Sequence, residues 1–204
     1  MRLESIKKLN ITLLFSSPLN HNLVSHQDLF DLFKTGDYQN DINNFIAAPG
    51  IRALILPAQQ RDVVFESNRI IINERTGKNP DESDLISSLE KISGKNFFEK
   101  EKIAAYGFNY EIIAISDDEN FGTNDLVSDK IANIGAIRGA GVDFVFDKDD
   151  KRYVAKIKSL EDVMKKFAVD LNIHYSQKDL PSFDDLKKHL IAGFGELKSL
   201  IAKI

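Results

Sequence analysis

The stretch Gly141-Val-Asp-Phe-Val-Phe-Asp-Lys-Asp-Asp-Lys-Arg-Tyr-Val-Ala-Lys-Ile-Lys158 decides the fold class of this chain. Apolar and polar residues alternate on both sides of a charged turn, which is the pattern of two antiparallel strands joined in a hairpin. One face of this hairpin carries Asp143 with Lys156 and Lys158. Strands that alternate in this way belong to antiparallel sheets with one buried and one solvated face.

The rest of the chain shows more strands, mixed with helices. Apolar runs or alternation predict strands over the ranges 11–15, 51–56, 63–72, 103–115 and 169–175. Within 63–72, Ser67-Asn68 forms the turn of a second hairpin. Helices are predicted where a capping residue precedes apolar residues at three- and four-residue spacing: after Ser25, from Pro80-Asp81 to 92, and over 123–134, 159–167 and 182–204. Residues 35–50 are rich in Asn, Asp and Gly and are predicted to form a loop with an apolar anchor at Phe45-Ile46.

These elements predict a single α+β domain, with a mainly antiparallel twisted sheet covered by several helices. The order hairpin, helix, strand occurs twice, at 62–115 and at 142–175. This order suggests an internal duplication with halves 1–117 and 118–204, although the two copies share little residue identity.

Composition narrows the class of protein. The chain has 204 residues and a formal net charge of −4, so no general basic field draws it to nucleic acid. It has no Cys, which excludes disulfides and thiolate chemistry. No apolar stretch has the length of a membrane span or of a signal-peptide core. We therefore expect a cytoplasmic protein that binds neither nucleic acid nor a membrane.

The hairpin at 142–158 resembles the core of PD-(D/E)xK nucleases. These enzymes place an Asp on one strand and a Glu-x-Lys on the next, around a divalent metal that activates water. Asp143 and Lys158 stand at the matching positions, but Lys156 stands where the family has its metal-binding Glu. The resemblance implies an intact or degenerate nuclease, in which Glu111 on the long predicted strand would have to supply the missing acid. The alternative is a hairpin with a solvated Asp143–Lys156 pair.

Other motifs for metals and cofactors are incomplete. An EF-hand beginning at Asp147 would need Gly and Glu at its sixth and twelfth positions, where this chain has Arg152 and Lys158. The glycine-rich stretch at 135–141 follows a predicted helix and precedes a strand, which is the reverse of a dinucleotide-binding loop. We expect no metal and no cofactor.

A polar patch is predicted on the strand at 169–175. There Asp170, Asn172 and His174 share one face. If the strand at 103–115 is its neighbour, Asn109 and Glu111 join them in a patch suited to binding or to acid–base chemistry. The alternative is the ordinary polar face of an antiparallel sheet.

The C-terminal helix is the other candidate for partner contact, including self-association. Its apolar stripe continues from Phe183 to Ile204, and Gly193 and Gly195 interrupt it. A glycine inside a helix costs up to about 1 kcal/mol relative to Ala, so these two bend the helix or allow another backbone to approach. The alternative is that the stripe packs on the protein's own sheet.

Together these observations favour a non-enzymatic binding or assembly protein, with a protein partner or a second copy at the polar sheet face or the C-terminal helix. The alternative is the nuclease-like protein described above. The motifs lean against an enzyme.

Overall fold

A computed structural model describes residues 1–34, 44–118, 121, 123–127, 137–160, 165–176 and 179–204. The strands are β1 (Arg2–Phe15), β2 (Asn44–Ala48), β3 (Ile51–Leu56), β4 (Arg61–Glu66), β5 (Arg69–Glu74), β6 (Ile103–Ile115), β7 (Gly141–Lys148), β8 (Lys151–Ser159) and β9 (Lys166–Tyr175). The α-helices of the described residues are α1 (His26–Phe33), α2 (Leu85–Ser93) and α4 (Phe183–Ile201). Short 3₁₀ turns lie at His21–Leu23, Pro57–Gln59, Lys100–Lys102 and Thr123–Leu126.

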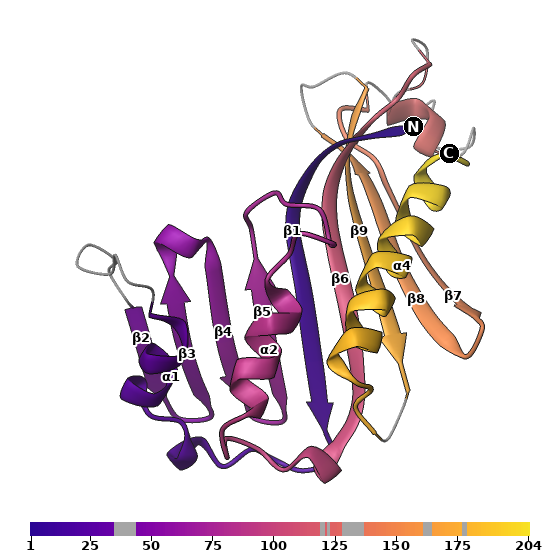
Figure 1. Cartoon of the computed structure of the whole chain (residues 1–204). Coiled ribbons are helices and arrows are strands. Elements are labelled where there is room, and N and C mark those ends of the chain that lie inside the picture. The colour runs from indigo at the N-terminus through magenta and orange to yellow at the C-terminus, as the bar shows by residue number, and fades with distance from the viewer. Residues whose placement is uncertain (35–43, 119–120, 122, 128–136, 161–164, 177–178) are drawn as a thin grey trace.

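The nine strands form one open antiparallel sheet in the order β2-β3-β4-β5-β1-β6-β9-β8-β7. The long strands β1 and β6 pair in its middle, and β2 and β7 are the two edges. All three described α-helices lie on one side of the sheet, with α1 over β3, α2 over β5 and β1, and α4 over β6 and β1 (Figure 1). We call the opposite side the open face. The predicted α+β class with an antiparallel sheet under helices is confirmed.

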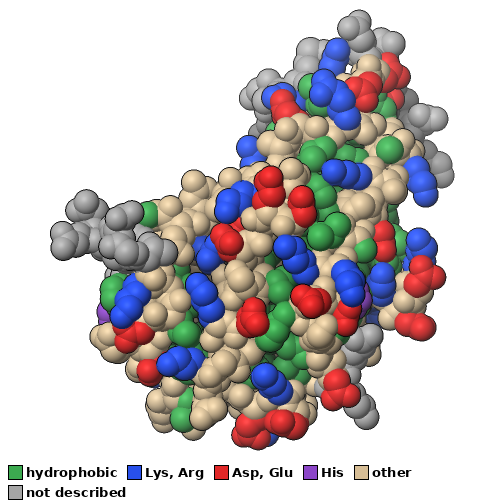
Figure 2. All heavy atoms as spheres, viewed as in Figure 1, with side chains coloured by type: hydrophobic (Ala, Val, Ile, Leu, Met, Phe, Trp, Pro, Cys, Tyr) green, Lys and Arg blue, Asp and Glu red, His purple; other side chains and the backbone are tan. Residues whose placement is uncertain are grey.

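The core lies between the sheet and these helices, because alternate strand residues point to that side. Leu9, Ile11 and Leu13 of β1 are buried there beside Phe108 and Tyr110 of β6. Figure 2 shows the helix-bearing side from outside, where acidic and basic side chains are interspersed among smaller apolar areas.

Helix α4 packs its apolar stripe on the protein's own sheet. Leu190, Phe194 and Leu197 are buried, and the hydroxyl of Tyr110 donates a hydrogen bond of 2.8 Å to the carbonyl oxygen of Leu190. A Cβ atom on Gly193 would overlap that hydroxyl, so this glycine permits the close approach of helix and sheet. The stripe is thus occupied within the chain, as the alternative interpretation held.

Aromatic rings fill the space under the first turns of α4. Tyr106 and Tyr175 stack with ring centroids 4.7 Å apart, and His189 of the helix stacks on Tyr175 at 5.2 Å. The Tyr106 hydroxyl and His189 Nδ1 share a hydrogen bond of 2.8 Å. Burial, followed by the charge of Lys151, lowers the pKa of His189, so its neutral form is favoured in this layer.

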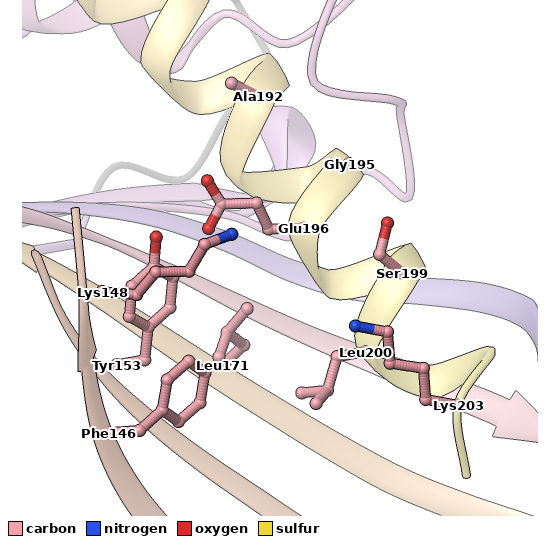
Figure 3. A pocket seen from close by; sticks show the side chains of 10 residues that line it. All are labelled: Phe146, Lys148, Tyr153, Leu171, Ala192, Gly195, Glu196, Ser199, Leu200 and Lys203. Carbon is pink, nitrogen blue, oxygen red and sulfur yellow. The ribbon is translucent and has the colours of Figure 1, made fainter.

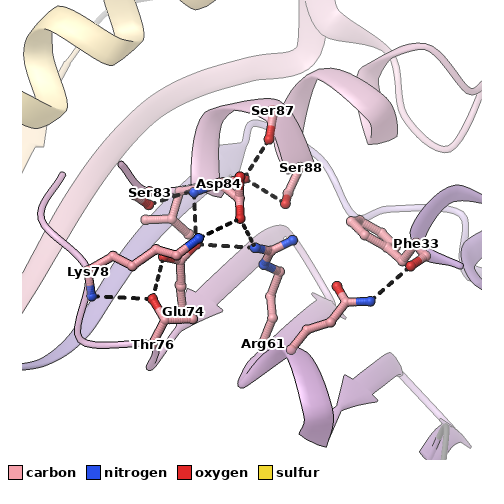
Figure 4. A network of polar contacts seen from close by, with 11 residues as sticks. Phe33, Arg61, Glu74, Thr76, Lys78, Ser83, Asp84, Ser87 and Ser88 are labelled. Carbon is pink, nitrogen blue, oxygen red and sulfur yellow. Dashed lines mark hydrogen bonds and ion pairs between the residues drawn. The ribbon is translucent and has the colours of Figure 1, made fainter. Parts of the chain in front are cut away.

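Helix α2 is held by a buried network of charges (Figure 4). Arg61 and Glu74 are paired in the register of β4 and β5, and both are less than a tenth exposed. One guanidinium nitrogen of Arg61 lies 3.3 Å from a carboxylate oxygen of Glu74 and 3.0 Å from a carboxylate oxygen of Asp84. The backbone amide of Asp84 donates to Glu74 at 3.0 Å. The helix therefore starts at Asp84, one turn later than the predicted opening at Pro80-Asp81, and it starts through these contacts without a side-chain capping hydrogen bond.

Several predicted elements differ in the structure. Strand β1 starts at Arg2, well before the predicted start at Ile11. The predicted loop at 35–50 contains strand β2, which pairs with β3, while 35–43 lie outside the described residues. β2 was missed because its five residues form a short edge strand, whose conformation depends on pairing with β3.

Two predicted helices are only partly described. The helix predicted at 159–167 is wrong at both ends, because Ser159 ends β8 and Phe167 lies in β9; residues 161–164 lie outside the described residues. Of the helix predicted at 123–134, the structure describes a 3₁₀ turn at Thr123–Leu126. Residues 128–134 lie outside the described part.

The two hairpin–helix–strand units are placed differently in the sheet. Hairpin β7–β8 pairs directly with β9, whereas β1 lies between hairpin β4–β5 and β6. The duplication stays a hypothesis. Within the described ranges, no helix is long and apolar enough to cross a membrane.

Candidate functional site

The open face of the sheet carries the predicted polar patch. Strands β6 and β9 are neighbours, with Asn109 opposite Asn172 and Glu111 opposite Asp170. His174 follows on the same face of β9, opposite the small Gly107. The adjacency on which the sequence argument depended is therefore confirmed. The use of these residues as a binding site stays a prediction.

One row of charges crosses five strands of the open face. In register from β1 to β7 it consists of Lys8, Glu111, Asp170, Lys156 and Asp143, and we call it the charge row. Lys8 forms an ion pair with Glu111, and Lys156 Nζ lies 3.8 Å from Asp143 Oδ2. Cross-strand pairs of opposite charge stabilise a sheet face that is exposed to water. The predicted Asp143–Lys156 pair is therefore part of a longer pattern.

A row of amides runs beside the charge row. Asp62, Asn73, Asn10, Asn109 and Asn172 are in register from β4 to β9. The Asn10 amide donates to Asn73 at 2.6 Å, and the Asn73 amide donates to Asp62 at 2.5 Å. Asn109 donates to Asn10 at 3.3 Å. The buried residues of this row form hydrogen bonds to one another, whereas Asn172 at its β9 end makes none to a described residue.

Three side chains of β9 remain available to a partner. Asp170, Asn172 and His174 make no hydrogen bond and no ion pair within 4.0 Å to any residue that the structure describes. Burial and then the neighbouring carboxylate of Glu111 raise the pKa of Asp170, and the cations of Lys8 and Lys156 oppose this. The Asp170 carboxyl therefore keeps its proton to a higher pH than an exposed carboxyl does.

In the described part of the chain, the candidate residues of the nuclease-like alternative lie apart, and that alternative stays a hypothesis. Lys156 lies between Asp143 and Asp170 in the charge row, so the cation that replaces the family's Glu keeps those two carboxylates apart. Glu111 lies three strands from Asp143, which is about 14 Å at the usual strand spacing. Among the described residues, no three His, Asp or Glu side chains gather closely enough to hold a metal ion. Lys158 instead borders a hollow of about 260 Å³ near Asp170 and Glu111.

An apolar patch occupies the other part of the open face, on β2 to β5. Its members share this side through the strand register: Ile46, Ile51, Ala53, Ile55, Val64 and Ile71. Ile46 is 44% exposed, and the patch lies opposite the side that bears α1 and α2. The predicted polar patch and C-terminal helix do not include these residues. The available signal was the near-continuous apolar character of 51–56, 63–65 and 70–72, which is typical of strands that are buried on both faces.

Comparison with known proteins does not assign a function to this chain. The chain matches no protein-family model, and no curated protein resembles it significantly. The candidate site is therefore the open face itself, with an apolar patch on one part and partly unpaired polar groups on the other.

Proposed function

We propose that this protein is a non-enzymatic binding and assembly protein, and that two copies associate through their open faces. The observation that carries the proposal is the apolar patch on a sheet face that no described helix covers. Sheets bury an apolar face against another layer, and uncovered apolar patches mark interaction surfaces. A second copy supplies the matching apolar layer.

The dimensions of the face suit a stable dimer. Nine strands spaced about 4.8 Å apart make it about 38 Å wide, and six residues at about 3.3 Å each make it about 20 Å long. Two such faces in contact bury on the order of 1,500 Å², which lies within the range of specific interfaces, about 1,200–2,000 Å². Aligned sheets pack in this way in β-sandwiches.

The polar patch supplies the rim of this interface. Specific interfaces combine an apolar centre with polar groups that form hydrogen bonds at the periphery. Asp170, Asn172 and His174 are half-buried and unpaired with described residues, so they can bond to a partner without first breaking contacts. The charge row restricts the two copies to relative orientations in which like charges do not face each other.

Sedimentation velocity over a wide concentration range tests the proposal with a matched pair of variants. Ile46→Lys places a charge in the apolar patch, and Ile191→Lys makes the same change on α4, on the other side of the molecule. The two side chains are 44% and 43% exposed, so each substitution has a similar direct effect on folding. We expect a dimer for the unmodified protein and for Ile191→Lys, and a monomer for Ile46→Lys.

Two outcomes contradict the proposal. One is an unmodified protein that sediments as a monomer at every concentration. The other is an equal loss of dimer in both variants, which would show that the interface is not specific to the open face.

A further inference from the structure

A groove lies on the helix side, between the C-terminal part of α4 and the hairpin β7–β8. Its volume is about 550 Å³, within the range of small-molecule sites. Figure 3 shows Phe146, Tyr153 and Leu171 of the sheet on one side, and Leu200 of the helix facing them. This groove is separate from the open face.

The floor of the groove is aromatic and only partly covered. The rings of Phe146 and Tyr153 stack with centroids 4.7 Å apart, and Phe144 continues the stack at 6.0 Å. Phe144 and Phe146 are half-buried. A flat apolar ligand or chain can therefore add to the stack and remove more of this surface from water.

Gly195 on the wall borders open space. A Cβ atom there would meet no atom of the described residues within 4 Å, in contrast to Gly193 two residues earlier. An interior helix glycine costs up to about 1 kcal/mol relative to Ala, and no contact offsets it at Gly195. Ala192 and Ser199 are the neighbouring small residues on the same wall. Together these residues keep the groove wide.

A buried hydroxyl lies on the floor of the groove. Tyr153 is 2% exposed, and Figure 3 shows its hydroxyl directed toward the helix, on the side of Glu196. Burial, followed by the neighbouring carboxylate of Glu196, raises the pKa of this hydroxyl. The aromatic floor is therefore uncharged at neutral pH.

The charges at the groove favour an anion. Glu196 is already paired with Lys151 at 3.3 Å. Lys148 and Lys203 also line the groove, and Lys148 has only a loose ion pair of 3.8 Å with the exposed Asp149. Exposed pairs of that kind contribute little, so both ammonium groups are available to a ligand.

We propose that this groove binds an amphipathic organic anion, with an aryl or medium-chain acyl body on the Phe146–Tyr153 floor and an acidic head group at one of the two lysines that border it, Lys148 or Lys203. The body gains from apolar burial and the head from the charge of the lysine beside it.

Fluorescence titration with anilinonaphthalene sulfonate, an aryl sulfonate, tests the proposal directly. We expect one saturable site per chain, displaced by dodecanoate and much less by the uncharged dodecanol. Gly195→Leu fills the groove, and since Leu favours helix more than Gly does, the variant stays folded. We expect it to weaken binding at least about tenfold, which corresponds to about 1.4 kcal/mol.

Charge-reversal variants separate the head-group contacts from general apolar binding. Lys148→Glu combined with Lys203→Glu should weaken both ligands several-fold, whereas Lys187→Glu, on an exposed part of α4 outside the groove, should leave them unchanged. The proposal is overturned if Gly195→Leu leaves the affinity unchanged, or if binding is lost in Ile46→Lys instead, because the dye would then occupy the open face. Equal competition by dodecanol and dodecanoate would exclude an anion site.

Discussion

The two halves of the sheet both bury apolar residues on the helix side, but they differ in the charges hidden there and in what the open face shows. In the N-terminal half, β2 to β5, the helix side hides the ions Arg61 and Glu74, while the open face shows the apolar patch. In the C-terminal half, β6 to β9, the helix side hides stacked aromatic rings, while the open face shows the charge row. β1 lies between the halves and pairs with both.

The difference shows which half of the sheet has an open face that is stable in contact with water. A polar open face is stable in water, and cross-strand pairs such as Lys8–Glu111 add a little stability. An apolar open face stays costly until another layer covers it. The C-terminal half therefore has the make-up of a finished two-layer domain, and the N-terminal half has the make-up of one that lacks a layer.

The largest effect is expected from breaking the buried ion network of the N-terminal half. Glu74→Leu leaves the buried Arg61 with only the half-exposed Asp84 as its acid and removes the acceptor of the Asp84 amide, and breaking a buried pair in this way costs about 3 kcal/mol. Urea unfolding measures the loss in the free energy of unfolding. The double variant Arg61→Leu with Glu74→Leu should regain most of it, because no charge is then left buried.

Exposed pairs give the control for that experiment. Arg69 and Glu66 form an ion pair at the surface of the same hairpin, so Glu66→Gln should cost less than about 1 kcal/mol. A Glu74→Leu protein as stable as the Glu66→Gln protein would show that the network does not hold α2 in place.

An intermediate effect is expected from the helix contact of the C-terminal half. Gly193→Ala forces a methyl group against the Tyr110 hydroxyl and the side chain of Ile173, and overpacking of this kind costs about 1–3 kcal/mol. Gly195→Ala, two residues away in the same helix, meets no atom and should stabilise the protein by up to about 1 kcal/mol. Thermal unfolding of both variants measures the two signs. If both changes have the same sign, close packing of α4 on β6 is not what Gly193 provides.

The smallest effect is expected from Asp170 in the charge row. Its raised pKa means that the folded chain holds this proton to a higher pH than the unfolded chain, whose value is 3.8. The contribution of Asp170 to stability therefore falls as the pH rises from 3.8 through the folded-state pKa. Asp170→Asn should stabilise the protein slightly at neutral pH, by less than about 1 kcal/mol.

The pH dependence of that gain distinguishes its cause. The advantage of Asp170→Asn over the unmodified protein should vanish below pH 3.8, when the carboxyl is protonated in both states. Asp143→Asn in the same row is the control, since Asp143 is 70% exposed and paired with Lys156, and should bring no gain. A gain for Asp170→Asn that is independent of pH would remove the electrostatic explanation.

Local periodicity was sufficient for much of the C-terminal half. Residues 103–115 and 169–175 alternate along their length, the 141–158 hairpin carries its own turn, and Ser182 precedes a regular helical stripe. Each of these patterns is complete within one segment, so it can be recognised without knowledge of the neighbours. The polar patch needed one further fact, the pairing of β6 with β9.

Features that depend on distant partners could not be predicted. The first residues of β1 and the whole of β2 are strands because β6 and β3 pair with them. The sequence also holds no sign that β1 separates β5 from β6. Strand formation is set more by the neighbouring strand and by burial than by the residues themselves.

The α+β class, the alternation that gives the sheet a buried and a polar side, and the C-terminal helix that covers it all follow from local sequence patterns. Which polar side chains meet depends on the folded arrangement of the strands. This arrangement places Lys156 between two carboxylates in the charge row and leaves an apolar patch on the uncovered side of β2 to β5. The periodicity of a strand fixes the face to which each of its side chains points. The neighbours of a side chain depend instead on register and strand order, and these arise from pairing between distant segments of the chain.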